Sequence, residues 1–152
     1  MREGGDALRT RPTNTEDNVT ASHQQTHQAG RHLAVAQALL QGLPARIVGQ
    51  QTHIEVNGHP ASVMVAGKGA WMIADVDAFT STSIETYVLV DVSTRRPDVY
   101  IAPGEELRGD VRQRHDEYMS RVGTRPRNPD SKHTKIEPAE VKQWKSGWKR
   151  FD

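Results

Sequence analysis

The apolar residues of 27–41, HQAGRHLAVAQALLQ, recur at the spacing of an amphipathic helix. Alanine and leucine dominate this segment and are the strongest helix formers, and Gly42 supplies a stop. We therefore predict a helix that packs one face against the core. The spacing places four residues on that face: Leu33, Ala36, Leu40 and Leu43.

A β-hairpin is predicted next, after a short strand at 45–50. Asn57 and Gly58 form the preferred dipeptide of a two-residue type I′ turn, which sets Val56 opposite His59. Alternation along the two strands then separates two faces of the hairpin. The predicted core face holds Ile54, Val56, Ala61, Val63 and Val65, and the opposite, more open face holds His53, Glu55, Ser62, Met64 and Ala66.

Three further strands are predicted, with a short helix at 76–81 between the first two. The unbroken apolar run YVLVDV is typical of a central strand that is covered on both faces. The three strands span 70–75, 87–92 and 99–103.

Two more helices follow in the pattern. The first spans 104–121, with Leu107, Val111 and Tyr118 facing inward, and the second runs from Glu137 to about Lys149, with Pro138 in its first turn. The order of all these elements predicts an α/β fold, a mixed β-sheet flanked by helices.

The composition separates a tail from this domain. Hydrophobic residues make up 35% of the 152 residues and aromatic residues 5%, which is lean for a compact domain. Residues 1–26 have few apolar side chains, so they cannot bury enough surface to offset the entropy lost on ordering. We expect a disordered tail over 1–26 and a single domain over 27–152.

The absence of cysteine excludes disulfides and thiolate metal sites. No apolar run approaches the roughly 18 residues of a membrane span, and no charged-then-apolar signal opens the chain. We therefore expect a cytoplasmic protein without a membrane partner.

Charge is nearly balanced over the whole chain, at +1, but not over its end. Residues 124–152 hold eight basic and four acidic residues, a net charge of +4, interleaved with Trp144, Trp148 and Phe151. This pattern suits phosphate contact with base stacking, although aromatic residues at helical spacing more often pack into the core while the lysines stay solvated. Candidate nucleic-acid contacts are Lys142, Lys145, Lys149 and Arg150.

Histidines are the other candidate ligands. His23 and His27 are four residues apart, and His53 and His59 flank the hairpin turn. Neither pair has a third ligand at a typical zinc spacing, so the sequence predicts solvated histidines without a metal.

Three stretches, HLAVAQALLQGLPARIVG, IEVNGHPASVMVAGKGAWMI and YVLVDVSTRRPDVYIAPGEEL, resemble the restriction-endonuclease-like (PD-(D/E)XK) superfamily over roughly residues 29–121. The resemblance implies a restriction-endonuclease-like sheet and a metal-dependent nuclease site on the hairpin. Active members hold one acid on the first hairpin strand and a Glu/Gln-x-Lys on the second, and these acids bind the Mg²⁺ that activates water. The corresponding places here fall at or near His53, Met64 and Ala66, and none of the three matches.

The sequence therefore predicts a nuclease-like scaffold with a degenerate catalytic motif, acting as a binding or interaction module with DNA or RNA as candidate partners. An alternative is an active Mg²⁺-dependent nuclease with a displaced site. Its candidate catalytic residues are Glu55, Lys68 and Asp75. A third hypothesis is an accessory or phage-related factor that binds a protein partner through its sheet edge or tail. If the motif is lost, no cofactor is expected.

Overall fold

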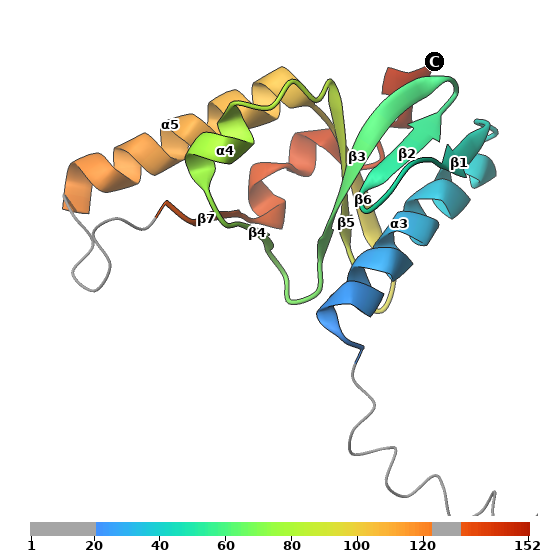
Figure 1. The fold of residues 1–152 in the computed structure, drawn as a ribbon, viewed down its shortest axis with the longest axis horizontal. Coiled ribbons are helices and arrows are strands. Elements are labelled where there is room, and N and C mark those ends of the chain that lie inside the picture. The colour runs from blue at the N-terminus through green and yellow to red at the C-terminus, as the bar shows by residue number, and fades with distance from the viewer. Residues whose placement is uncertain (1–20, 123–131) are drawn as a thin grey trace, which may run out of the picture.

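The computed structural model describes residues 21–122 and 132–152 of the chain. Its centre is a five-stranded mixed sheet with the strand order β1-β2-β3-β5-β6 (Figure 1). The strands are β1 (Ala45–Ile47), β2 (His53–Val56), β3 (His59–Ala66), β5 (Thr86–Asp91) and β6 (Asp98–Pro103). A separate two-stranded sheet pairs β4 (Trp71–Ile73) with β7 (Thr134–Ile136). The predicted α/β class is thus confirmed.

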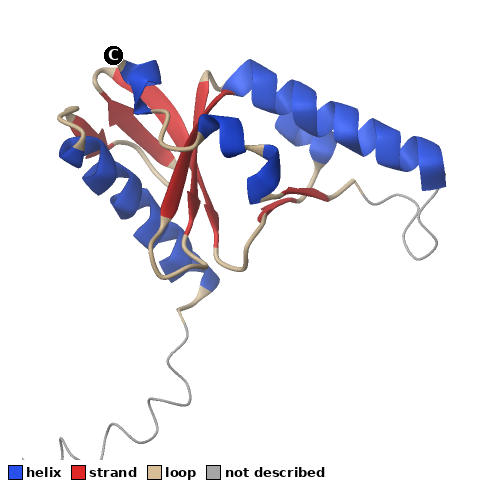
Figure 2. Cartoon of the chain, turned by 180° about the vertical axis from the view of Figure 1, so that it is seen from behind, coloured by secondary structure: helices blue, strands red, loops and turns tan. Residues whose placement is uncertain are grey.

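Helices lie on both sides of the large sheet (Figure 2). Helix α3 (His23–Leu40) packs on one face. On the other side lie the short helix α4 (Val76–Thr80), the long helix α5 (Gly104–Val122) and the β4-β7 pair. The chain ends in three 3₁₀ turns: η1 (Pro138–Glu140), η2 (Lys142–Trp144) and η3 (Trp148–Phe151).

Helix α3 begins earlier than predicted, and its inward face only partly matches the prediction: Leu33 and Leu43 pack half-buried against the core, whereas Ala36 and Leu40 are exposed. Ser22 caps it through a capping box with Gln25, so residues 23–26 of the expected tail are helical, while residues 1–20 lie outside the described part. Its buried residues are Gly30, Arg31, Ala34 and Ala38, whereas the Leu40 side chain is 78% exposed.

Small side chains explain this shift of the buried face. A Cβ at Gly30 would collide with the Val65 side chain, so the helix backbone lies almost directly on β3. The buried Arg31 then donates hydrogen bonds of 2.8–3.2 Å to the carbonyls of Val48, Gly49 and His53. These bonds give the backbone carbonyls around the loop before β2 a donor. Leucine spacing alone could not reveal a helix that packs through its smallest residues.

The hairpin register is confirmed. Val56 lies opposite His59 and Ile54 opposite Ala61, and the predicted core face is buried against α3. The opposite face is less open than expected: Ser62 and Ala66 are buried and Met64 is half-buried, because a second apolar cluster covers them.

The strand predicted at 70–75 does not join the hairpin sheet. Gly69 adopts a φ of +88° in the bend after β3, and β4 then pairs with β7 instead. The place beside β3 is taken by β5, which runs parallel to it and is buried along its whole length. The prediction of 87–92 as the central strand is therefore confirmed, apart from a shift of one residue.

Helix α5 has the predicted bounds within one residue, but its inward face ends early. Leu107 and Val111 are buried as expected, and the next buried residue is His115. The Tyr118 side chain is 39% exposed, contrary to prediction, because α5 runs past the edge of the sheet (Figure 1).

The predicted helix over 137–149 is absent. Pro138 does start a turn, but Lys145 is extended and bridges to Tyr100 on β6, and the Ser146 amide donates to the Val99 carbonyl at 2.8 Å. Pairing with the free edge of β6 thus replaces the helical hydrogen bonds. The three aromatic residues, Trp144, Trp148 and Phe151, still pack inward, with Trp148 and Phe151 beside α3 and Trp144 in the other cluster.

No helix within residues 21–122 and 132–152 is long and apolar enough to cross a membrane.

Candidate functional site

The place of the expected catalytic motif is filled by an indole ring. Trp71, 1% exposed, donates from Nε1 to the carbonyls of Met64 and Val90, both at 3.2 Å. Its ring meets Tyr100 edge-on, with 5.5 Å between the ring centroids. Ala66 is buried in the same cluster and Met64 packs against it half-buried, whereas His53 is exposed. A large aromatic residue directly after the Gly67-Lys68-Gly69 bend is predicted by the sequence to anchor the sheet, and the burial of Trp71 confirms this prediction.

The three residues of the displaced-site alternative do not form one site. Glu55 pairs with Arg46 on the neighbouring strand at 3.0 Å. It lies opposite Pro60, six residues from the far end of β3, which is about 20 Å at 3.3 Å per residue, and Lys68 lies beyond that end. Asp75 serves a different purpose, because its carboxylate caps α4 by accepting the amides of Asp77 and Ala78.

Among the residues that the structure describes, no group of three or more His, Asp or Glu side chains could hold a metal ion. The His23 and His27 rings lie 4.4 Å apart on the first turns of α3. Burial, together with the neighbouring His23, lowers the pKa of His27, which favours its neutral form.

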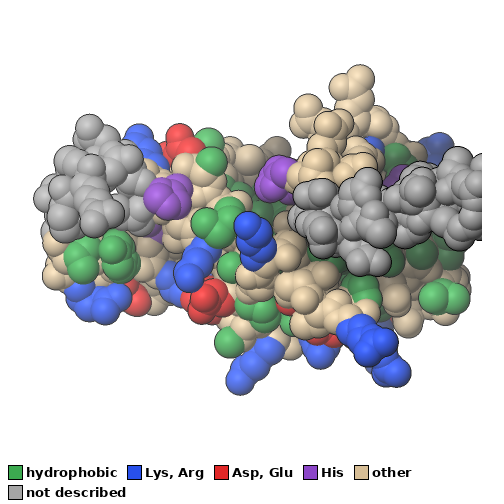
Figure 3. Space-filling view, turned by 90° about the horizontal axis from the view of Figure 1, so that it is seen from below, with side chains coloured by type: hydrophobic (Ala, Val, Ile, Leu, Met, Phe, Trp, Pro, Cys, Tyr) green, Lys and Arg blue, Asp and Glu red, His purple; other side chains and the backbone are tan. Residues whose placement is uncertain are grey.

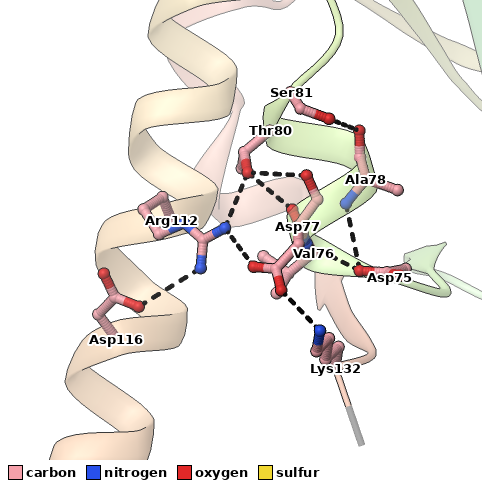
Figure 4. A network of polar contacts seen from close by, with 9 residues as sticks. All are labelled: Asp75, Val76, Asp77, Ala78, Thr80, Ser81, Arg112, Asp116 and Lys132. Carbon is pink, nitrogen blue, oxygen red and sulfur yellow. Dashed lines mark hydrogen bonds and ion pairs between the residues drawn. The ribbon is translucent and has the colours of Figure 1, made fainter.

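A polar network joins α4, α5 and the start of β7 (Figure 4). One carboxylate, Asp77, accepts from Arg112 at 2.6 Å and from Lys132 at 2.9 Å. The hydrogen bond from Arg112, followed by that from Lys132, holds the pKa of Asp77 below its ordinary value. Arg112 also donates to Thr80, and the Val76 amide donates to the Lys132 carbonyl. Asp77 therefore holds α5 and the strand β7 in fixed positions relative to α4.

A cleft of about 480 Å³ lies between α5, β4, β7 and η1. Helix α5 and the β4-β7 pair supply most of its lining, and Glu137 and Glu140, at the start and the end of η1, also line it. Its lining residues are Met72, Arg114, His115, Tyr118, His133, Thr134, Lys135, Glu137 and Glu140. The volume is in the range of small-molecule sites.

The carboxylates of this cleft already have donors. Glu140 accepts from Arg114 Nε at 3.0 Å and from the Glu137 amide at 2.8 Å, and Glu137 accepts from Lys135 at 3.2 Å. Two nitrogens of the lining residues, Nη2 of Arg114 and Nδ1 of His115, have no hydrogen-bond partner among the residues that the structure describes. Both atoms are closed off from solvent, so the surface of the cleft consists of other groups of the lining.

A second hollow, of about 830 Å³, lies at the start of α5. Acidic side chains dominate it, and its two arginines are already bound: Arg108 donates to the Ile84 carbonyl at 2.6 Å and Arg150 to the Glu85 carbonyl at 3.1 Å. The smaller cleft also has large exposed apolar side chains in its lining, Met72 and Tyr118, so it is the better candidate.

The candidate nucleic-acid contacts are only partly available. Lys145 pairs with Asp98 at 3.4 Å, and Arg150 donates to Thr86 at 3.0 Å. Lys142 and Lys149 are exposed. Beside Lys145, burial and the charge of Asp98 raise the pKa of Tyr100, so this phenol stays protonated.

The sequence did not point to the cleft residues. Leu107, Val111 and His115 recur every four residues, which is helical spacing. This spacing would have predicted His115, and not Tyr118, as the next inward residue of the helix. Strand β7 is only three residues long and follows a loop, so no periodicity marked it.

No family model, curated protein or solved structure matches the chain.

Proposed function

We propose that the protein is a non-catalytic binding module on a restriction-endonuclease-like scaffold. The order of a helix, an antiparallel meander and a parallel strand supports the proposed scaffold. The observation that carries the loss of catalysis is the Trp71 indole, which lies beside Met64 and Ala66, where the Glu/Gln and the lysine of the motif would stand. No cofactor is required by this function.

A cleavage assay tests the loss of catalysis. Purified protein is incubated with plasmid, duplex and single-stranded oligonucleotides in Mg²⁺ and in Mn²⁺. We expect no more cleavage than in a mock purification. Cleavage that co-purifies with the protein and is abolished in Glu55→Ala, but not in a matched Glu117→Ala variant, would overturn the proposal. Glu117 is an exposed residue of α5.

We further propose that the cleft beside α5 is the binding site of the module. Its support is a cavity of ligand size whose lining combines charged side chains with the exposed apolar side chains of Met72 and Tyr118. The test is a ¹H–¹⁵N correlation spectrum recorded with a set of anionic, neutral and cationic small molecules. Shifts should concentrate at residues 114–118 and 133–137, and a set that perturbs neither segment would contradict the assignment.

Nucleic acid is the second candidate partner, favoured by the exposed Lys142 and Lys149 on a segment fixed to the sheet. Lysines contact phosphates as point charges, so binding should be weak, tolerant of sequence and steeply salt-dependent, with a slope near −0.9 per phosphate neutralised on duplex DNA. Fluorescence anisotropy at several salt concentrations measures it. Lys142→Gln with Lys149→Gln should lower the slope by roughly two units. No binding of the unaltered protein at ~50 mM salt would exclude this partner.

A further inference from the structure

We infer that Asn57 is a deamidation site, and that its deamidation loosens residues 148–152, which pack beside the hairpin turn. This inference does not depend on the cleft or on any partner proposed above. Three features support it: a hydrogen bond from the Asn57 side chain to a distant part of the chain, the exposed glycine that follows Asn57, and the hydrogen-bonding character of the product.

The Asn57 side chain joins the hairpin turn to η3. Its Nδ2 donates to the Phe151 carbonyl at 2.6 Å, across 94 positions of the chain. A carbonyl oxygen only accepts, so the nitrogen of the amide, and not its oxygen, faces Phe151. The Phe151 ring also lies beside the hairpin, with 6.4 Å between its centroid and that of the His59 ring. Figure 1 shows the hairpin turn next to the end of the chain marked C.

Other contacts hold the same segment from its other side. Arg150 donates to the Thr86 hydroxyl at 3.0 Å and to the Glu85 carbonyl at 3.1 Å, which fixes η3 to the start of β5. Trp148 and Phe151 are buried in the cluster beside α3. Loss of the bond to Asn57 should therefore loosen residues 148–152 without unfolding the domain.

The residue after Asn57 makes its amide reactive. Asn57 and Gly58 are both exposed, and the space at Gly58 is open, since a Cβ there would meet no atom within 4 Å. The backbone nitrogen of Gly58 attacks Cγ of Asn57, which closes a five-membered succinimide ring and expels the side-chain nitrogen as ammonia. Water then opens the ring at one of its two carbonyls and leaves aspartate or isoaspartate. Glycine hinders this attack least, because it has no side chain.

The folded protein should slow the reaction. Ring closure requires Cγ to rotate towards the Gly58 nitrogen, so the bond to Phe151 has to open first. Asn57 also has a φ of +51°, as a type I′ turn requires, and the turn resists a change of its backbone conformation. The reaction should therefore proceed from the fraction of molecules in which this contact is open.

The product cannot restore the contact. An ionised aspartate at position 57 carries only acceptors, and it would face the Phe151 carbonyl, which also only accepts. Isoaspartate adds a methylene group to the backbone of the turn as well. Either product replaces a hydrogen bond with repulsion, so deamidation acts as a one-way loosening of residues 148–152.

The rate of deamidation tests the protection by the fold. The full chain is incubated in mildly alkaline buffer, folded or in guanidinium chloride, and mass spectrometry of digests follows the gain of one dalton at Asn57. We expect conversion in the folded protein to be at least about tenfold slower, because only the opened fraction reacts. Equal rates in the two states, or no conversion in guanidinium chloride, would overturn the inference.

A pair of matched variants tests the coupling between the amide and the segment. Arg150→Gln removes the bonds to Thr86 and Glu85 without altering Asn57, so conversion in the folded protein should speed up about twofold or more. The control, Arg95→Gln, makes the same change in the exposed turn between β5 and β6, at the opposite end of the sheet, and should leave the rate unchanged. Figure 3 shows that end of the molecule from below, with several basic side chains at its surface. Acceleration by both variants, or by neither, would contradict the coupling.

The effect of the product is tested with Asn57→Asp, a mimic that type I′ turns accept. Hydrogen exchange of residues 146–152 should be at least about fivefold faster than in the unaltered protein, the factor for one lost hydrogen bond. Asn57→Gly keeps the turn without adding a carboxylate, so its exchange should lie between the two. Exchange in Asn57→Asp as slow as in the unaltered protein would contradict the loosening, even if Asn57 deamidates.

Discussion

Two residues, Trp71 and Gly30, show how single side chains set the distances between layers. Trp71 joins β3, β4 and β5 because its one donor reaches carbonyls on two strands of the large sheet. Gly30 lets α3 approach β3 without a side chain between them. Trp71 fills space in the core, whereas Gly30 makes room for a neighbouring side chain. Substitutions at the two positions should therefore destabilise the fold for opposite reasons, a cavity at Trp71 and a steric clash at Gly30.

Trp71→Ala should lower the free energy of unfolding by about 3–5 kcal/mol, because it leaves a large cavity and two strand carbonyls without their donor. Urea unfolding followed by circular dichroism measures the loss. Trp71→Phe, which keeps an aromatic ring in the layer, should lose less. A loss below about 1 kcal/mol for Trp71→Ala would show that the indole is not part of the core.

Gly30→Ala should destabilise the protein by about 1–3 kcal/mol, because the new methyl group meets Val65 in a packed core. The matched control is Gly109→Ala in α5, where a Cβ meets nothing within 4 Å. That change should stabilise the helix by up to about 1 kcal/mol. The melting temperature should therefore fall for Gly30→Ala and rise for Gly109→Ala. Shifts of the same sign would contradict the close approach of α3 to β3.

At the scale of elements, the parts fixed by neighbours in sequence could be predicted and the parts fixed by distant strands could not. The Asn57-Gly58 turn sets its own register, and the apolar run of β5 indicates burial without reference to any partner. Strand β4 and residues 145–146 instead pair with strands far away along the chain. Their local pattern carried no information on that pairing.

The same distinction applies to the candidate site. The failure of the catalytic motif at Met64 and Ala66 was readable from the sequence, because the hairpin register places these residues. The cleft was not readable, because it joins Met72, Arg114 and Glu140 from three separate elements. Only the fold brings them together.

Asp77 makes the packing of α4 against α5 depend on pH. Because the pKa of its carboxyl is lowered in the folded protein, its ionic contacts stabilise the fold above the unfolded pKa, near 4, and are lost as the pH falls through the folded value. Asp77→Asn should therefore be less stable than the unaltered protein at pH 7, and the difference should shrink as the pH falls below about 4. Urea unfolding at pH 7 and at several lower pH values measures this.

The control for Asp77 is Asp116→Asn, which removes a longer contact to Arg112, at 3.7 Å, and leaves Asp77 in place. It should show a smaller loss at pH 7. If the free energy of unfolding of Asp77→Asn stays below that of the unaltered protein by the same amount from pH 7 to pH 2, the charge of Asp77 does not contribute to stability.

On the scale of the whole molecule, the described residues form two apolar clusters on the two faces of one sheet. Val88 and Val90 belong to the cluster beside α3, and Tyr87 and Leu89 to the other, so β5 contributes alternate residues to both. Neither cluster can form without that strand. The two halves are thus expected to fold together.

Equilibrium unfolding should accordingly be one cooperative transition. Trp148→Phe leaves Trp71 and Trp144 as fluorescent reporters of the second cluster alone, while circular dichroism at the helix bands includes α3. The two signals should give the same midpoint in urea. Separate midpoints would show that the clusters unfold independently.

The indole of Trp71 also limits how this scaffold can be redesigned. Rebuilding a metal site on the hairpin would require a carboxylate at Met64 and a lysine at Ala66, and both would lie in the apolar cluster beside that ring and lose hydration. Removing the ring first would leave a cavity in the layer shared by three strands. Each single substitution towards such a site should therefore lower the stability of the fold, and several coordinated substitutions would be needed to build it.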